Sequence, residues 1–170
     1  MNNLLRITTQ YIESEDRIRL VGETAPGQTV VLWLTQRLLG RLLPHLFALL
    51  ESLGDDDVSR EVVQEFAQQV ATGELVPQAP VRVESQSHVG LVQSVDVAVL
   101  RRGVRLAFKR AVADEEAETI VLMLQPQLLR QWLSILFAQF QKAGWQLEVW
   151  PKWMIRAQAR QQSAGSNPLH

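Results

Sequence analysis

Two stretches of the chain share one pattern of hydrophobic and polar positions. Each begins with five apolar residues, 30–34 or 120–124, a length and composition that predict a short buried strand. After a polar break, apolar residues recur at the spacing i, i+3, i+4, i+7 and i+11 of an amphipathic helix. These stripes consist of residues 39, 42, 43, 46 and 50 in the first stretch and 129, 132, 133, 136 and 140 in the second. Each stretch therefore predicts a buried strand followed by a helix whose apolar stripe faces a core.

Residues at the ends of the two predicted helices are of types that commonly begin or end a helix. Thr35 can cap the start of the first helix, and Pro126 suits the first turn of the second. Gly54 and Gly144 stand where a left-handed residue commonly ends a helix. The sequence thus predicts both helices with their limits.

The two stretches resemble each other beyond their pattern. Residues 30–54 and 120–144 align without a gap, and ten of 25 positions are identical. Upstream, residues 17–20 resemble 103–106, and each is preceded by a further predicted strand. We infer a duplication into two β-β-β-α halves, residues 4–54 and 91–144. The predicted fold class is α+β, with the halves related by a pseudo-twofold axis and forming one or two antiparallel sheets with helices packed on one side.

The remaining segments complete a single globular domain over residues 1–155. A helix is predicted over 58–72, with Val62, Val63, Phe66 and Val70 on one face. A stiff linker over 74–90 joins the halves and contains a possible edge strand. After the last helix, alternation over residues 145–150 predicts another strand. We expect residues 156–170, which are small, polar and basic, to form a disordered tail.

Composition excludes several classes of protein. The 170 residues include no cysteine, so a disulfide scaffold, a thiol nucleophile and a cysteine-ligated metal are excluded. A net charge of −1 argues against a strongly cationic nucleic-acid binder. The first residues do not fit a signal peptide, and the longest apolar stretch is too short to span a bilayer. We therefore expect a cytoplasmic protein.

No motif predicts catalysis, a metal or a cofactor. The segment 22–29 resembles a phosphate-binding loop, but Gln28 replaces the lysine that such a loop needs, and a hairpin turn explains it better. His88 lies in a polar run upstream of Asp96, yet no nucleophile elbow accompanies them. His45 is interpreted as a helix-flank residue. We accordingly expect a protein without enzymatic activity, metal or cofactor.

A cluster of positive charge is one candidate contact surface. Five cations fall within ten residues, and they are Arg101, Arg102, Arg105, Lys109 and Arg110. Such a hairpin could contact nucleic-acid phosphates, although the acidic run 114–118 would partly cancel its field. A solvent-facing strand with self-complementary charges is the simpler interpretation.

The tryptophans suggest a second surface. Trp150 and Trp153, with Lys152 and Arg156, lie where the domain ends, and tryptophan and arginine are enriched among residues that dominate binding energy. The alternative is a segment folded back so that both rings are buried. The leading hypothesis is a non-catalytic interaction or assembly protein that forms a homo-oligomer or binds another protein. Alternatives are a nucleic-acid-binding accessory protein using residues 101–110 and, less favoured, an enzyme or small-ligand binder with a site between the halves. No membrane partner is expected.

Overall fold

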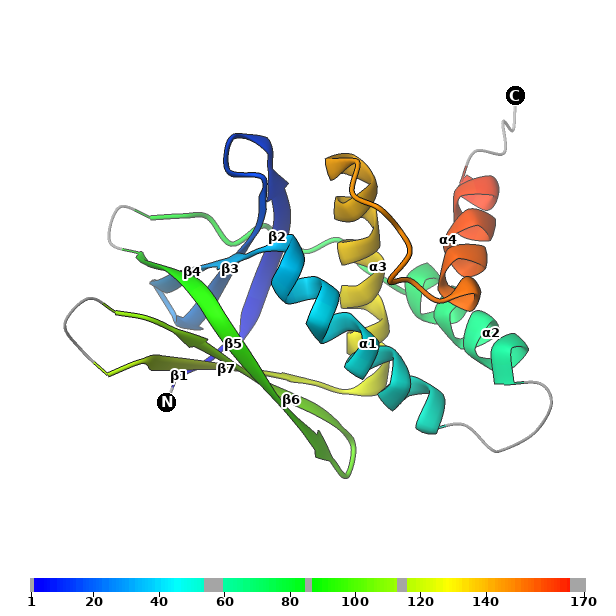
Figure 1. The fold of residues 1–170 in the computed structure, drawn as a ribbon, viewed down its shortest axis with the longest axis horizontal. Coiled ribbons are helices and arrows are strands. Elements are labelled where there is room, and N and C mark those ends of the chain that lie inside the picture. Colours follow the sequence, from blue (N-terminus) through cyan, green and yellow to red (C-terminus); the bar gives the residue numbers. More distant parts are fainter. Residues whose placement is uncertain (1, 54–59, 85–86, 113–115, 166–170) are drawn as a thin grey trace.

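The computed structural model describes residues 2–53, 60–84, 87–112 and 116–165, which form one curled sheet and four helices (Figure 1). The strands are β1 (Asn2–Asn3), β2 (Arg6–Ile12), β3 (Arg17–Ala25), β4 (Gln28–Leu34), β5 (His88–Leu100), β6 (Gly103–Arg110) and β7 (Glu118–Leu124). The helices are α1 (Gln36–Ser52), α2 (Arg60–Gly73), α3 (Pro126–Ala143) and α4 (Lys152–Gly165). A short 3-10 turn, η1 (Glu13–Glu15), joins β2 to β3. The predicted α+β class is therefore confirmed.

The sheet is mixed, so the expectation of purely antiparallel pairing is wrong. The strands follow the order β1-β7-β6-β5-β4-β3-β2. Pairing is antiparallel within β2-β3-β4 and within β5-β6-β7, but β4 pairs with β5, and β1 with β7, in parallel. The β4–β5 pair is parallel because α1 and α2 carry the chain back between these two strands, whereas hairpins join the antiparallel strands.

The N-terminal strand brings the two ends of the sheet together. Its first residues pair with β7 and its later residues pair with β3, with only Leu4 and Leu5 between. The Leu4 amide donates to the Val121 carbonyl at 2.8 Å, and the Leu5 amide donates to the Glu23 carbonyl at 2.8 Å. Gly22 permits this crossing, because a Cβ there would overlap the side chain of Leu4. The N-terminal segment 2–12 thus supplies both edge strands of the sheet, β1 and β2. Because the two edges are joined by this short segment, the sheet curls toward closure, which limits exposed strand edges.

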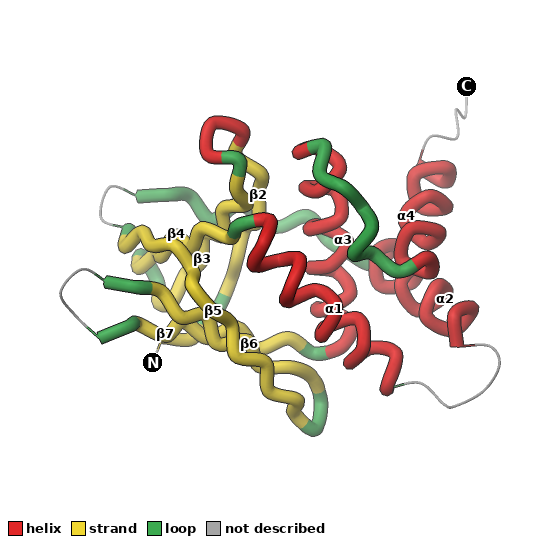
Figure 2. Tube along the Cα trace, viewed as in Figure 1, coloured by secondary structure: helices red, strands yellow, loops and turns green. Residues whose placement is uncertain are grey.

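The core lies between the concave face of the sheet and the helices α1 and α3. Figure 2 shows the helices gathered on one side of the strands. Every residue of the two predicted stripes is buried in this core, which confirms the orientation of both helices. The buried stripes pack against inward-facing strand residues such as Leu20, Leu32, Leu106 and Leu122. The helices are therefore held by the amphipathic pattern from which they were predicted.

The predicted helix ends are confirmed where they are described. The Thr35 hydroxyl accepts a hydrogen bond from the Leu38 amide at 3.1 Å, and Pro126 is in the first turn of α3. Gly144 ends α3 with φ 69°, in the left-handed region where a side chain is disfavoured. Gly54 lies outside the described residues.

Neither the edge strand predicted at residues 81–86 nor the strand predicted at 145–150 forms in the described part of the chain. Residues 81–84 run as irregular chain, and residues 85–86 lie outside the described part. Residues 145–150 form a loop in which Trp145 and Trp150 are buried against Phe140 of α3. The alternation of apolar and polar residues over 145–150 therefore does not mark the two faces of a strand. It arises because the Trp145 and Trp150 rings attach a loop to the core.

The expectation of a disordered tail is wrong for residues 156–165. They continue α4, which begins at Lys152 and lies beside α2 (Figure 1). Met154 and Ala157 are buried in this contact region, so a few apolar residues spaced for a helix suffice to fix the segment. Residues 166–170 of the expected tail lie outside the described residues.

Candidate functional site

The most unusual surface is the outer face of α2, because its apolar residues point away from the core. Val62 and Phe66 are 67% and 68% exposed, and Val63 and Val70 are 49% and 42% exposed. Val62, Phe66 and Val70 follow each other at intervals of four, so they form one row along the helix. We call these four residues the α2 stripe. An amphipathic helix ordinarily turns such a stripe inward.

The polar face of α2 is buried instead. The Gln64 side-chain amide donates to the Leu50 carbonyl at 2.9 Å, near the C-terminal end of α1. The Gln68 amide donates to the Arg130 carbonyl of α3 at 2.9 Å, and Gln68 is fully buried. The Gln131 amide of α3 donates back to the Ala71 carbonyl at 3.0 Å. These bonds fix the side of α2 that faces the protein.

Arg130 is the centre of this buried polar layer. Its guanidinium donates to the Gln64 side-chain oxygen and lies over the ring of Trp153, 5.7 Å from the ring centroid. Burial lowers the pKa of Arg130 to about 10, since removal from water disfavours the charged form. The group therefore stays charged at neutral pH, and a buried charge of this kind depends on its polar neighbours.

Helix α4 covers a second side of α2 through charged contacts. Arg156 pairs with Glu61 at 3.3 Å, and Arg160 pairs with Glu65 at 3.0 Å. Both arginines belong to α4 and both glutamates to α2. Glu61 and Glu65 of α2 are thus neutralised by arginines of the same chain. The apolar stripe of α2 is not covered by these pairs and faces solvent.

The residues predicted as partner contacts divide into two groups. Trp150 and Trp153 are each 3% exposed and pack around Phe47, so both rings are folded back into the protein. The Trp153 indole also donates to the Glu51 carboxylate at 3.0 Å. Lys152 and Arg156 are exposed. The surface at this end of the chain therefore presents Lys152 and the Arg156–Glu61 pair, and the rings lie beneath it.

The five predicted nucleic-acid contacts differ in exposure and in pairing. Arg101 and Arg102 are exposed in the turn between β5 and β6, and Arg105 is half-buried. Lys109 pairs with Asp96 at 2.6 Å. Arg110 is buried and pairs with Glu118. The sequence signal of five neighbouring cations therefore overstates the free positive charge.

The residues considered for chemistry are far apart. His88 begins β5, and Asp96 lies eight residues later on the same strand, about 26 Å away at the rise of a strand. Asp96 is also occupied by Lys109, and His45 is exposed on α1. No three histidine, aspartate or glutamate side chains in the described part of the chain are placed to hold a metal ion.

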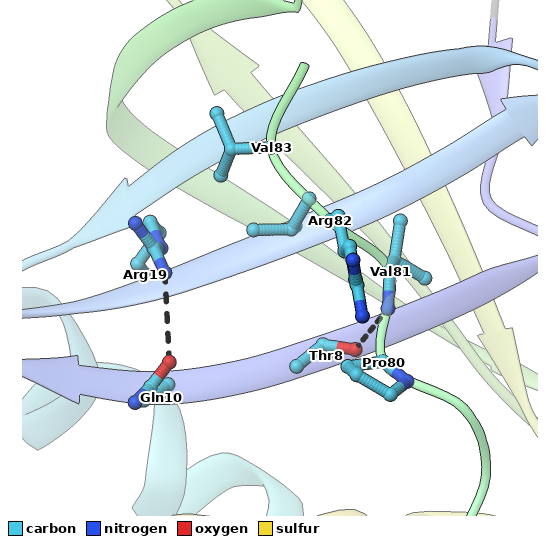
Figure 3. Close-up of a pocket in the computed structure, with 8 residues that line it drawn as sticks. Thr8, Gln10, Arg19, Pro80, Val81, Arg82 and Val83 are labelled. Carbon is cyan, nitrogen blue, oxygen red and sulfur yellow. Dashed lines mark hydrogen bonds between the residues drawn. The ribbon is translucent and has the colours of Figure 1, made fainter.

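Two cavities lie along β2. The larger, of about 640 Å³, is an apolar groove bounded by residues 74–80, the start of the N-terminal strand and the first turns of α3. The smaller, of about 270 Å³, lies over the outer face of β2 and β3 beneath residues 80–83 (Figure 3). Arg19 and Arg82 both border the smaller cavity. Sequence reasoning missed both cavities, because residues 74–84 carry no pattern that predicts where this segment crosses the sheet.

Comparison of the chain with protein-family models, with curated proteins and with solved structures finds no match in any of the three. Within the described residues, no helix combines the length and the apolar character needed to cross a membrane. The candidate site is accordingly defined by its own geometry.

Proposed function

We propose that the protein is a non-catalytic, cytoplasmic assembly module whose α2 stripe binds the same stripe of a second copy. The observation that carries the proposal is the exposure of four large apolar side chains on a helix that buries Gln64, Glu65 and Gln68. Exposed contiguous apolar patches of this kind mark interaction sites in soluble proteins.

A second copy is the occupant that the charges favour. The ion pairs of Arg156 with Glu61 and of Arg160 with Glu65 leave little unmatched charge beside the stripe, so a strongly charged partner gains little there. The net charge of the chain is −1, and two copies therefore repel each other weakly. A two-fold dimer also needs only one self-complementary surface.

The spacing of the stripe suits an antiparallel pair of α2 helices. Phe66 lies midway between Val62 and Val70, so a two-fold axis beside Phe66 would bring each Val62 opposite Val70 of the other copy. Helices packed in this way approach to about 8–10 Å between axes. Two phenylalanine rings at the centre would contribute most of the binding energy.

The internal duplication also belongs to this proposal. In support, Ile18 pairs with Leu34 in the first half, and Val104 pairs with Leu124 in the second, at the offsets that the sequence alignment uses. The parallel pair β4–β5 likewise joins the last strand of the first half to the first strand of the second, and β7, the last strand of the second half, pairs with β1, which directly precedes the first half. We propose that the pseudo-twofold arrangement of halves 4–54 and 91–144 arose by duplication.

The test measures the oligomeric state by light scattering over a dilution series. We expect the natural protein to be a dimer and the double variant Val62→Gln, Phe66→Gln to be a monomer with an unchanged circular-dichroism spectrum. The matched control is Val99→Gln, Leu100→Gln, which removes two exposed apolar residues at the tip of the β5–β6 hairpin and should remain dimeric. A natural protein that is monomeric at every concentration, or an α2 variant that stays dimeric, would refute the proposal.

A further inference from the structure

We infer that the cavity over β2 and β3 is a binding site for a small phosphate monoester, with Arg19 and Arg82 as the phosphate-binding residues. This site lies on the outer face of the sheet, away from the α2 stripe, and its function does not depend on self-association. The inference rests on the walls of the cavity, on the state of its two arginines and on its size.

The cavity has a fixed floor and an anchored cover. Thr8, Gln10, Arg19 and Val21 form the floor on neighbouring strands, and residues 80–83 cross above them (Figure 3). The cover is attached at Val81, whose amide donates to the Thr8 hydroxyl at 2.8 Å.

The Val81 side chain fixes the cover further, because it is buried with Val21 and Val31 in a small cluster on the outer face of the sheet. Arg82, the next residue, is consequently held beside the cavity. A binding group that is positioned before the ligand arrives loses less entropy on binding.

The two arginines have no carboxylate partner among the described residues. The Arg19 guanidinium reaches the Gln10 side-chain oxygen only at 3.5 Å, and its Nε is buried without a hydrogen-bond partner in the described structure. Arg82 is exposed at the rim. In contrast, Arg6, which lies close by on β2, pairs with Glu23 at 3.2 Å. The neighbouring carboxylate on β3 is thus already neutralised, and the positive charge of Arg19 remains for a ligand.

A phosphate group fits this arrangement better than a neutral ligand. Guanidinium groups stay charged and donate in a planar fork that matches phosphate oxygens, so two of them suit a doubly charged group. The Thr8 hydroxyl and the Gln10 side-chain amide can add hydrogen bonds. Glu84 is exposed two residues beyond Arg82 and would disfavour a ligand that extends toward it. Together these groups select a compact anion.

The volume limits the rest of the ligand. A volume of about 270 Å³ leaves room for a phosphate and a small organic group. Pro80, Val81 and Val83 offer apolar contacts to that organic group. A monoester should therefore bind more tightly than inorganic phosphate.

The experiment titrates the full-length protein with glycerol 3-phosphate, inorganic phosphate and glycerol, and follows binding by amide chemical shifts and calorimetry. We expect saturable binding of glycerol 3-phosphate, weaker binding of inorganic phosphate and none of glycerol. Shifts should centre on residues 8–10, 19–21 and 80–83. Absence of saturable binding by either phosphate, or binding of inorganic phosphate alone, would overturn the assignment.

Variants test the role of each arginine. Arg19→Gln and Arg82→Gln should each weaken glycerol 3-phosphate binding by about tenfold, the effect of losing one charge-assisted contact. Arg101→Gln, in the turn of the β5–β6 hairpin, is the matched control and should leave binding unchanged. An equal loss in Arg101→Gln would show diffuse attraction to the whole protein and overturn the site. If Arg19→Gln fails to fold, Arg82→Gln still tests the inference, because the Arg82 side chain is exposed and its loss should leave the fold intact.

Discussion

Helices α2 and α3 carry similar amphipathic patterns but face opposite ways. In α3 the apolar stripe, which includes Trp132 and Phe140, is buried between the sheet and the loop that follows the helix. In α2 the apolar stripe is exposed, and Gln64 and Gln68 are buried in its place. The pattern therefore predicts that a helix has two faces, but the groups that surround the helix decide which face is turned inward.

The surroundings of α2 explain the difference. Helix α2 packs against α3 and α4. Its buried face meets the Arg130 guanidinium and the backbone carbonyls of residues 50 and 130. These groups need polar partners when they are buried, because an unsatisfied buried polar group costs about 1–3 kcal/mol. The core stripe of α3, in contrast, lies in the apolar core cluster with side chains of the sheet and α1, and its Trp132 indole donates to Thr9 at 3.0 Å.

The largest expected effect comes from exchanging phenylalanine for alanine in each helix. Phe140→Ala should lower the free energy of unfolding by about 3–5 kcal/mol, because it leaves a cavity in the core. Phe66→Ala should lower it by less than about 1 kcal/mol when measured at a dilution that favours the monomer, because the ring is exposed. Urea denaturation measures both. Equal losses would contradict the outward orientation of α2.

A second prediction concerns the buried polar face of α2. Gln68→Met keeps the shape of the side chain but removes its hydrogen bonds to the Arg130 carbonyl and the Thr72 hydroxyl. We expect a loss of about 1–3 kcal/mol in the free energy of unfolding. Gln69→Met, one residue along on the same helix and only half-buried, is the control and should change stability little. A Gln68→Met variant as stable as the natural protein would mean that these bonds do not orient α2.

The sequence sufficed for the elements that meet the apolar core. Both stripes, the Thr35 cap and the left-handed Gly144 are local signals, and each follows from the residues within one or two turns. The parallel pairs of the sheet and its closure by the N-terminal segment were missed, since their partners are 58 residues apart in β4–β5 and 118 apart in β1–β7. Tertiary contacts of this kind leave no local pattern.

The candidate site was predicted less well for the same reason. The sequence singled out Trp150 and Trp153 by residue type, but both rings fill the space between α1 and α3. The α2 stripe was visible as a helix face, whereas its exposure depends on Arg130 and on α4, which the sequence suggested would be partly disordered. No periodicity in α2 itself distinguishes an inward stripe from an outward one.

A third prediction concerns Arg130, whose charge is buried beside α2. Arg130→Met should change the free energy of unfolding by less than about 1.5 kcal/mol, since the lost contacts with Gln64 and Trp153 are offset by removal of a desolvated charge. Thermal and urea unfolding measure the change. A loss above about 3 kcal/mol in the free energy of unfolding would contradict this prediction. It would show that the contacts of the guanidinium stabilise the fold by far more than the desolvation of its charge destabilises it.

The smallest expected effect lies at the turn between β2 and β3, where Asp16 contacts the loop that follows α3. Hydrogen bonds from the Tyr11 hydroxyl and the Trp145 indole lower the pKa of Asp16 below its usual value. Because the folded pKa is below the unfolded one, Asp16 stabilises the fold above its unfolded pKa and loses this contribution as the pH falls through the folded pKa. We expect Asp16→Asn to be less stable at neutral pH by a small margin and to lose less stability on acidification. Identical acid unfolding curves would contradict this role.

The orientation and pairing of α2 can be tested most directly with a single cysteine, because the natural chain contains none. In the variant Phe66→Cys, a two-fold axis beside residue 66 brings the two thiols within reach of a disulfide, which needs Cα atoms about 4.4–6.8 Å apart. The measurement is the rate of disulfide-linked dimer formation under mild oxidation, with the exposed Val99→Cys as the control. We expect rapid dimer formation at residue 66 and slow formation at residue 99. Slow formation at both positions, or equal rates, would contradict this expectation.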